Sequence, residues 1–302
     1  MWQIFLMYAL FGSVFTVGKA ALAFSPPYFL TAYRMLLSGG VLLVYQWIKD
    51  PSSIKEARKW GPLLLGIAFF NVFITNAFEF WGLQYMSAGK TSLLYSISPF
   101  AAALFAYLLS TEAMNRTKAA GIALGLFSFA PLLLNPWQQP GSDMRDELAA
   151  EAALAVSALT SVIGWYLFKS LSSQSALPGA AINGISFIIA GVMSLAVSLL
   201  FEEAPPLSNL VESKFLLAFF YIVLVHNLFC YAIYAKSLKS YSVTFLTFAG
   251  LSNPLFAAIT GALILQETVE WPFYIALLGG AGGLYLIFRG DEISASQKAT
   301  PR

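Results

Sequence analysis

The sequence is poor in charge, cysteine and histidine. Only 11% of its 302 residues are charged, whereas a soluble domain carries about 25%. One cysteine, Cys230, excludes an internal disulfide and a multi-cysteine metal site, and one histidine, His226, excludes histidine-rich metal ligation. A net charge of +2 gives no field for steering a polyanion. The sequence therefore excludes a nucleic-acid binder and an ordinary soluble enzyme, and we expect no metal and no cofactor.

Apolar residues make up 58% of the chain and gather in long runs. A helix needs about 20 mostly apolar residues to cross a bilayer. Ten runs meet this condition: 2–24, 28–48, 61–83, 89–110, 118–134, 148–169, 179–201, 214–236, 241–265 and 271–288. We therefore expect an all-α polytopic membrane protein whose function lies inside the helix bundle.

The basic residues predict the orientation of these spans. With the N-terminus inside, the cytoplasmic segments carry twelve of the 17 lysines and arginines. The outer segments carry three, namely Lys90, Arg145 and Lys214. Because basic loops stay on the cytoplasmic side, we expect a multi-pass protein of the cell inner membrane with both termini in the cytoplasm.

The two halves of the chain are similar to each other. Residues 98–134 align with residues 253–289 without a gap, at an offset of 155 positions. Each half holds five spans, and an odd number places the second half upside down relative to the first. We therefore expect two inverted five-helix repeats, residues 1–139 and 146–302, around a central cavity. Such repeats are typical of secondary transporters, which open a midplane site to alternate sides.

Several motifs carry a family resemblance. A proline in the fourth and ninth spans (Pro99 and Pro254), a glutamate at the end of each of these helices (Glu112 and Glu267) and a glycine-rich closing helix resemble the EamA-type drug/metabolite transporters. The opening FGSVFTVGK, followed by a proline and an arginine, is similar to the first two helices of that family and also to S-adenosylmethionine/S-adenosylhomocysteine exchangers. The resemblance implies a ten-helix carrier with a central substrate cavity.

Four charged side chains, Lys19, Arg34, Glu79 and Lys90, fall in the outer third of predicted spans. A charge inside the bilayer costs at least a few kcal/mol, so each needs a partner or a water-filled cavity. The simplest arrangement pairs Glu79 with Lys19, with Arg34 or with both. Two interpretations stay open. The pair is structural, or a basic side chain binds a substrate carboxylate or phosphate while Glu79 binds an amine or a proton.

Polar residues near the membrane midplane are the second group of candidates. The offset of 155 pairs Asn71 with His226 and Asn76 with Tyr231. An inverted-repeat carrier builds its site at such positions, although hydrogen bonds between helices are an equally good interpretation. Aromatic residues within the spans could stack a planar or cationic substrate or simply pack. The predicted substrate-binding residues are Lys19, Arg34, Asn71, Asn76, Glu79, Tyr95, Trp165, Tyr166, His226, Asn227, Tyr231 and Asn253.

The leading hypothesis is a secondary transporter for a small polar metabolite. The sequence holds no GxxxxGK[ST] motif, so ATP does not drive it directly, and exchange or an ion gradient must supply the energy. S-adenosylmethionine/S-adenosylhomocysteine exchange fits, as does transport of amino acids or nucleotide sugars. An intramembrane enzyme and a channel are the alternatives from other classes. The motifs Gly121-x-x-x-Gly125 and Gly279-x-x-x-Gly283 predict close packing within the bundle, and we expect a monomer or a weak homodimer.

Overall fold

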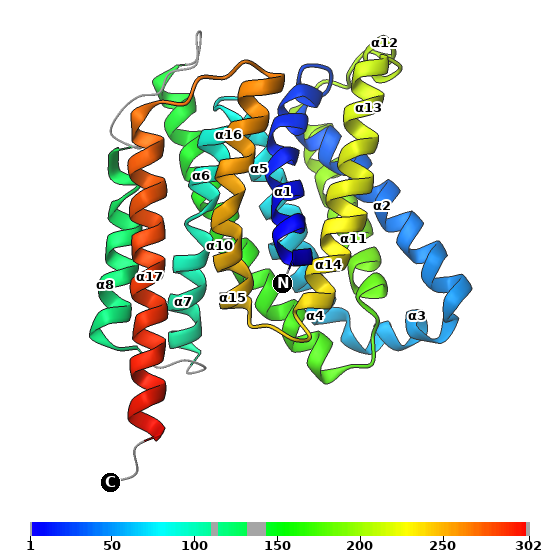
Figure 1. Cartoon of the computed structure of the whole chain (residues 1–302). Helices are drawn as coiled ribbons and strands as arrows, with labels where there is room; N and C mark the ends of the chain where they lie inside the picture. Colours follow the sequence, from blue (N-terminus) through cyan, green and yellow to red (C-terminus); the bar gives the residue numbers. More distant parts are fainter. Residues whose placement is uncertain (1, 110–113, 132–142, 300–302) are drawn as a thin grey trace.

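The computed structural model of the chain describes residues 2–109, 114–131 and 143–299, with side chains up to residue 290 (Figure 1). Every regular element within these residues is a helix. The first half contains α1 (Trp2–Leu22), α2 (Pro27–Lys49), α3 (Pro51–Ala57), η1 (Arg58–Trp60), α4 (Gly61–Gly66), η2 (Ile67–Ile74), α5 (Thr75–Leu83), α6 (Ala88–Tyr95), α7 (Ser98–Leu108) and α8 (Arg116–Phe127). The second half contains α10 (Met144–Gln174), α11 (Gly179–Phe201), α12 (Leu207–Leu210), α13 (Ser213–Tyr221), η3 (Ile222–Cys230), α14 (Tyr231–Ser237), α15 (Val243–Ala249), η4 (Gly250–Ser252), α16 (Asn253–Ile264) and α17 (Trp271–Ala299).

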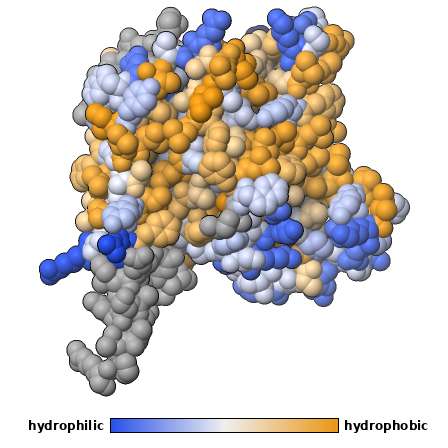
Figure 2. Space-filling model, viewed as in Figure 1, coloured by the Kyte–Doolittle hydropathy of each residue, from blue (hydrophilic) through white to orange (hydrophobic). Residues whose placement is uncertain are grey.

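Nine helices or runs of consecutive helices in the described part of the chain are long and apolar enough to cross a membrane. They coincide with nine of the ten predicted runs. The tenth run, 118–134, begins in α8 and ends outside the described residues, where Glu112 also lies. Figure 2 shows an apolar band across the viewed face of the molecule, with polar residues above and below it. Large apolar side chains such as Leu199, Phe201 and Leu263 are more than three-quarters exposed, as lipid-facing residues of a multi-pass membrane protein must be.

The fourth and ninth spans start and break in the same way. Ser87 Oγ accepts a hydrogen bond from the backbone N–H of Lys90 at the start of α6, and Ser242 Oγ accepts one from Phe245 N–H at the start of α15. Such serine caps satisfy N–H groups that a helix start leaves unpaired. The span breaks after α6 and again after α15, and each following helix carries proline at its second position. Proline suits this position because it lacks an N–H.

The third and eighth spans share a second irregularity. Each contains a π-helical segment, η2 in the first half and η3 in the second. Their first residues, Ile67 and Ile222, are separated by the same 155 positions as the two caps. A π-helix widens the turn and is frequent at functional sites. Four irregular spans therefore line up in pairs across the two halves.

The two halves pack against each other through matching helices. α2 contacts α11, and α8 contacts α17. α1 packs on α16 and η3, while α10 packs on α6 and η2. The α8–α17 contact is close because Gly121 and Gly283 face each other: a Cβ on either glycine would lie 2.5 Å from the carbonyl oxygen of the other. The predicted packing role of these two glycines within the bundle is confirmed.

Candidate functional site

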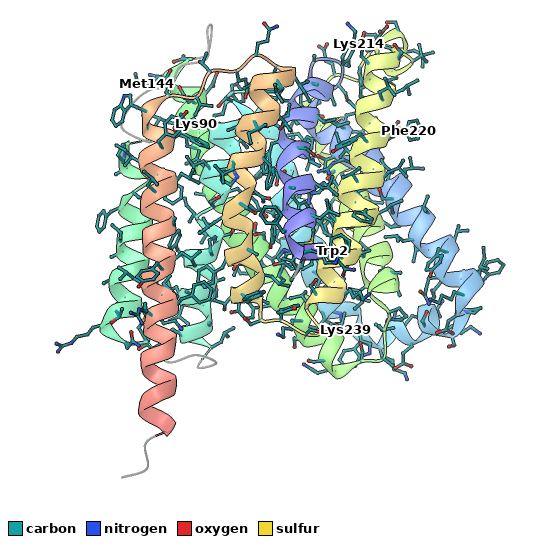
Figure 3. All side chains as sticks on the ribbon, in the orientation of Figure 1. Trp2, Lys90, Met144, Lys214, Phe220 and Lys239 are labelled. Atoms are coloured by element: carbon teal, nitrogen blue, oxygen red, sulfur yellow. The ribbon has the colours of Figure 1, made fainter. Side chains whose placement is uncertain are left out.

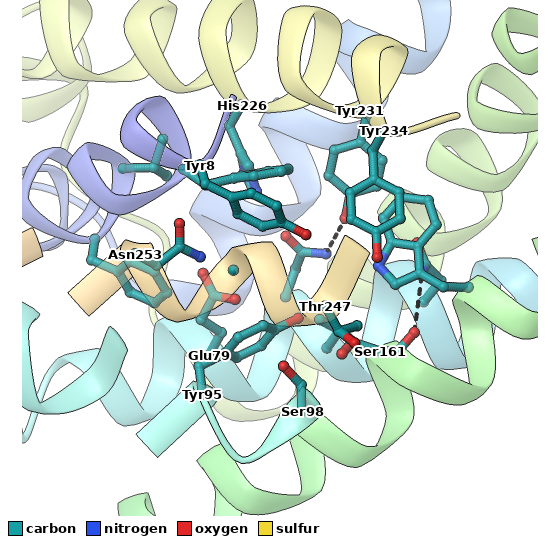
Figure 4. Close-up of a pocket in the computed structure, with 18 of the residues that line it drawn as sticks. Tyr8, Glu79, Tyr95, Ser98, Ser161, His226, Tyr231, Tyr234, Thr247 and Asn253 are labelled. Atoms are coloured by element: carbon teal, nitrogen blue, oxygen red, sulfur yellow. Dashed lines mark hydrogen bonds between the residues drawn. The ribbon is translucent and has the colours of Figure 1, made fainter. Parts of the chain in front are cut away.

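A polar cavity lies between the two halves, at the level of the irregular spans (Figure 4). It contains about 720 Å³ of space free of protein atoms, part of which is open to the exterior. Side chains from α1, η2, α5, α10, η3 and α14 line it, together with residues at the α6–α7 and α15–α16 breaks. Both halves thus contribute to one chamber, and the helix breaks bring polar backbone and side chains to its wall.

Eight of the twelve predicted site residues line this cavity. They are Asn71, Asn76, Glu79, Tyr95, Trp165, His226, Tyr231 and Asn253. Four others, Lys19, Arg34, Tyr166 and Asn227, do not reach its surface. Tyr166 instead donates its hydroxyl to the carbonyl oxygen of Ala102 at 3.3 Å. Depth along a span predicted which residues lie near the midplane, but the helical face decided which of them reach the chamber.

The cavity wall is built largely from pairs of residues separated by the repeat offset. Asn71 and His226, Asn76 and Tyr231, Glu79 and Tyr234, Tyr95 and Gly250, and Ser98 and Asn253 all line it. Every pair differs by 155 positions. The chemistry of the two partners differs, however, since the carboxylate of Glu79 in one half corresponds to the phenol of Tyr234 in the other. The chamber is therefore pseudo-symmetric in shape and asymmetric in charge.

Glu79 supplies the carboxylate of the cavity. It is 6% exposed. Among the described residues no basic nitrogen lies within 4 Å of it and none donates a hydrogen bond to it. Figure 4 shows its carboxylate pointing into the space bordered by Tyr8, Tyr95 and Asn253. A buried charge without a partner is costly, so this carboxylate is available for a cation or for the cationic end of a ligand.

Lys19 does not pair with Glu79, so that predicted arrangement is wrong. Its ammonium lies 3.2 Å from Glu267 and donates to the carbonyl oxygen of Met86 at 2.5 Å. Glu267 also accepts a hydrogen bond at 2.9 Å from the N–H of Ala88, the first residue of α6. A carboxylate at a helix N-terminus is stabilised by the helix dipole. This cluster therefore joins α1, α6 and the segment after α16 above the cavity.

Arg34 lies behind the cavity wall in a network of neutral acceptors. It is fully buried and donates to His226 Nδ1 at 2.8 Å, to Asn227 Oδ1 at 3.1 Å and to Asn76 Oδ1 at 2.7 Å. Its guanidinium carbon lies 4.1 Å from the centroid of the Phe80 ring. No carboxylate of the described residues lies within 4 Å of it. The predicted pairing of Arg34 with Glu79 is thus absent, and the network ties α2 to both π-helical spans.

Aromatic rings form one wall of the chamber. The indole of Trp165 stacks on Tyr234 with centroids 3.8 Å apart, and it lies 5.5 Å from Tyr231. Phe11 meets the His226 ring edge to face at 5.2 Å. Tyr8 donates its hydroxyl to the carbonyl oxygen of Leu246, which fixes its ring beside the wall. Stacked aromatic faces can hold a planar ring or a cation.

The structure also identifies cavity residues that sequence reasoning missed. They are Tyr8, Phe11, Val14, Phe15, Thr75, Ser96, Ser98, Ser161, Tyr234, Thr247 and Gly250. Three of them could have been found, because Tyr234, Ser98 and Gly250 are the repeat partners of the predicted residues Glu79, Asn253 and Tyr95. The others carry no comparable signal, since serine, threonine and aromatic residues are common throughout the spans. Within the described residues no cluster of three metal-ligating side chains occurs.

Lys90 belongs to a separate buried cluster. Its ammonium lies 2.5 Å from Glu147 and 2.7 Å from Glu151, both on α10. None of these side chains lines the chamber. Lys90 therefore holds α6 against α10.

The model of the EamA-like transporter family matches residues 1–134 and 148–289. The chain belongs to this transporter family. A Chlamydia muridarum protein named S-adenosylmethionine/S-adenosylhomocysteine transporter is 36% identical over 267 residues, which cover 88% of this chain and 84% of that protein. The protein of the same name from Chlamydia trachomatis serovar L2 is 34% identical over 88% of this chain and 81% of its own length.

More distant EamA relatives are also similar over most of the chain. An uncharacterized transporter of Bacillus subtilis is 25% identical over 281 residues, covering 90% of this chain and 84% of its own. A solved crystal structure of a protein superposes with a TM-score of 0.70 at 18% identity, covering 96% of both chains. That likeness establishes the fold.

Proposed function

We propose that this EamA transporter exchanges S-adenosylmethionine for S-adenosylhomocysteine across the cell inner membrane. The observation that carries the proposal is the polar chamber, which is lined both by stacked aromatic rings and by the carboxylate of Glu79, which has no ion-pair partner among the described residues. S-adenosylmethionine combines a sulfonium cation, an amino-acid zwitterion and an adenine ring. A carboxylate and aromatic faces bind such a cation and such a ring. The names of the two chlamydial relatives, at 34% and 36% identity, support the same substrate pair.

Alternating access would arise from two inverted five-helix units, residues 1–139 and 146–302. The repeated caps, π-helical segments and proline breaks at an offset of 155 support this division. Helix directions support the inversion: Trp2, at the start of α1, lies well below Met144, at the start of α10, in Figure 3. Rocking of one unit against the other would open the chamber to each side in turn.

Exchange supplies its own driving force. A cell that consumes S-adenosylmethionine as a methyl donor produces S-adenosylhomocysteine, so the outward gradient of the product can drive uptake of the substrate. This accounts for a carrier without a nucleotide-binding motif. The second candidate is export of an amino acid, because the zwitterion of S-adenosylmethionine is itself an amino acid and the same carboxylate would bind its ammonium group.

Counterflow in proteoliposomes tests the proposal. Vesicles loaded with S-adenosylhomocysteine should accumulate labelled S-adenosylmethionine, with saturation. Glu79→Gln should reduce this uptake about 10-fold or more, because a charge-assisted contact contributes about 1.5–3 kcal/mol. The matched control is Glu203→Gln, which changes an exposed carboxylate remote from the chamber and should leave uptake unchanged. Counterflow with amino acids alone would favour the second candidate, and no counterflow with either would reject both.

A further inference from the structure

The hydrogen bonding of His226 fixes which of its ring nitrogens carries the proton. Arg34 Nη1 lies 2.8 Å from His226 Nδ1. A guanidinium has donors and no acceptor, so Nδ1 must be the acceptor of this bond. The proton of the neutral imidazole therefore resides on Nε2. Nε2 makes no hydrogen bond with any described residue, and the ring lines the chamber, so His226 offers the chamber an unused N–H donor.

The charge behind this donor is positive. Arg34 contacts neutral acceptors and an aromatic ring, and no carboxylate of the described residues lies within 4 Å of it. Its guanidinium sits directly behind the imidazole, on the side away from the chamber. In a medium of low dielectric constant, a nearby cation strengthens the hydrogen bond from an N–H to an anionic acceptor. Arg34 therefore acts on the chamber through His226 without reaching its surface.

The chamber also carries a charge of the opposite sign, since Glu79 lines it with a carboxylate that accepts no hydrogen bond from any described residue. Building on the proposed function, we propose that the chamber orients its substrate as a dipole. The Nε2–H of His226 binds the substrate carboxylate, and Glu79 takes the cationic groups. His226 is then a specificity-determining residue, and Arg34 is the positioning residue that fixes its tautomer and supplies the field. This differs from the sequence-based interpretation in which a basic side chain, such as that of Arg34, contacts the substrate carboxylate directly.

A binding assay with two ligands tests the assignment. The probes are S-adenosylmethionine and decarboxylated S-adenosylmethionine, which keeps the sulfonium, the amine and the adenine but has no carboxylate. Their affinities are measured by competition on the purified full-length protein. The wild type should bind the carboxylate-bearing ligand about 10- to 100-fold more tightly, as expected for one charge-assisted hydrogen bond. The ratio of the two affinities is the readout, because general damage to the fold would weaken the binding of both ligands to a similar extent.

Two amide substitutions of His226 distinguish the role of Nδ1 from the role of Nε2. His226→Asn places an amide near Nδ1, where its oxygen still accepts from Arg34, but leaves nothing at the position of Nε2. It should remove most of the preference for the carboxylate. His226→Gln reaches the position of Nε2 and can present an N–H there, so it should keep much of that preference. Melting temperatures of both variants in detergent show whether they are folded.

The outcomes are distinct. An unchanged affinity ratio in a folded His226→Asn variant, or a wild type that binds both probes equally, overturns the assignment while leaving the proposed function intact. A wild type that binds neither probe overturns the proposed function and the assignment together. Loss of the ratio in His226→Asn with retention in His226→Gln supports the assignment.

Discussion

At the scale of single residues, each charged side chain inside the bundle lies where its charge can be stabilised. Lys19 and Lys90 have carboxylate partners, whereas Arg34 has neutral acceptors and Glu79 has the chamber. Arginine suits its position because its planar fork can serve several acceptors at once. Three polar side chains on two other spans are satisfied by this one guanidinium. Arg34 therefore stabilises the packing of three spans in addition to its proposed role in substrate binding.

This dual role predicts a stability effect for Arg34→Met. The substitution leaves the acceptors of His226, Asn76 and Asn227 without their donor, and each buried unpaired group costs about 1–3 kcal/mol. We expect a clear loss of thermal stability in detergent, measured by the melting temperature. Arg58→Met is the matched control because Arg58 is exposed in η1 and should change stability by less than about 0.5 kcal/mol. Equal melting temperatures for the two variants would contradict the assigned role of Arg34.

The sequence predicted eight of the nineteen chamber residues, but it did not predict how the charged ones pair. Counting along a span gives the depth of Lys19 and Glu79, and both lie near the outer end of their spans. It does not say that Glu267, 248 positions from Lys19, takes the ammonium. Such contacts depend on how distant helices rotate and cross, which no local pattern encodes. The repeat offset is the exception, because it connects positions in different helices and would have identified Tyr234.

At the scale of elements, the irregular spans line the chamber together with α1 and α10, whereas α2 pairs with α11 and α8 pairs with α17. The caps and proline breaks of the fourth and ninth spans are predictable from the local sequence, since serine and proline have strong local conformational preferences. The π-helical segments are not, because residues such as Ile67 and Ile222 give no local reason for a wider turn. The spacing of the glycines in α8 and α17 predicted that these helices pack closely within the bundle.

That contact gives a prediction at the element scale. A Cβ at Gly283 would lie 2.5 Å from the carbonyl oxygen of Gly121 and 2.8 Å from the backbone nitrogen of Gly125. Because backbone atoms cannot yield as a side chain can, Gly283→Ala should destabilise the protein by about 1–3 kcal/mol. Gly40→Ala is the control, since nothing lies within 4 Å of its added methyl group. Alanine favours the helix over glycine, so the control should match or exceed the wild-type melting temperature. A tolerated Gly283→Ala would mean that α8 and α17 can separate without cost.

At the scale of the whole molecule, two of the clusters that join the halves lie on the same side of the chamber. Glu202, at the end of α11, accepts hydrogen bonds at 2.8 Å from the N–H groups of Tyr28 and Phe29 at the start of α2. The Lys19–Glu267 pair joins α1 to the segment after α16 at the same side. Both clusters must break if the halves rock apart there. They are ion pairs and helix caps at the edge of the apolar belt, where water can replace each lost bond.

The proposed inversion of the two halves makes a prediction about their first helices. Gln3, in α1, and Arg145, in α10, are both exposed, and each lies at the start of its half. If the halves are inverted and the basic segments face the cytoplasm, these two positions lie on opposite sides of the membrane. In intact cells, a membrane-impermeant maleimide should label Arg145→Cys but should label Gln3→Cys only after permeabilisation. The wild type is the control because its one cysteine, Cys230, is buried. Labelling of both variants from the same side would mean that the halves run parallel, and a rocking mechanism based on inverted units would then lose its basis.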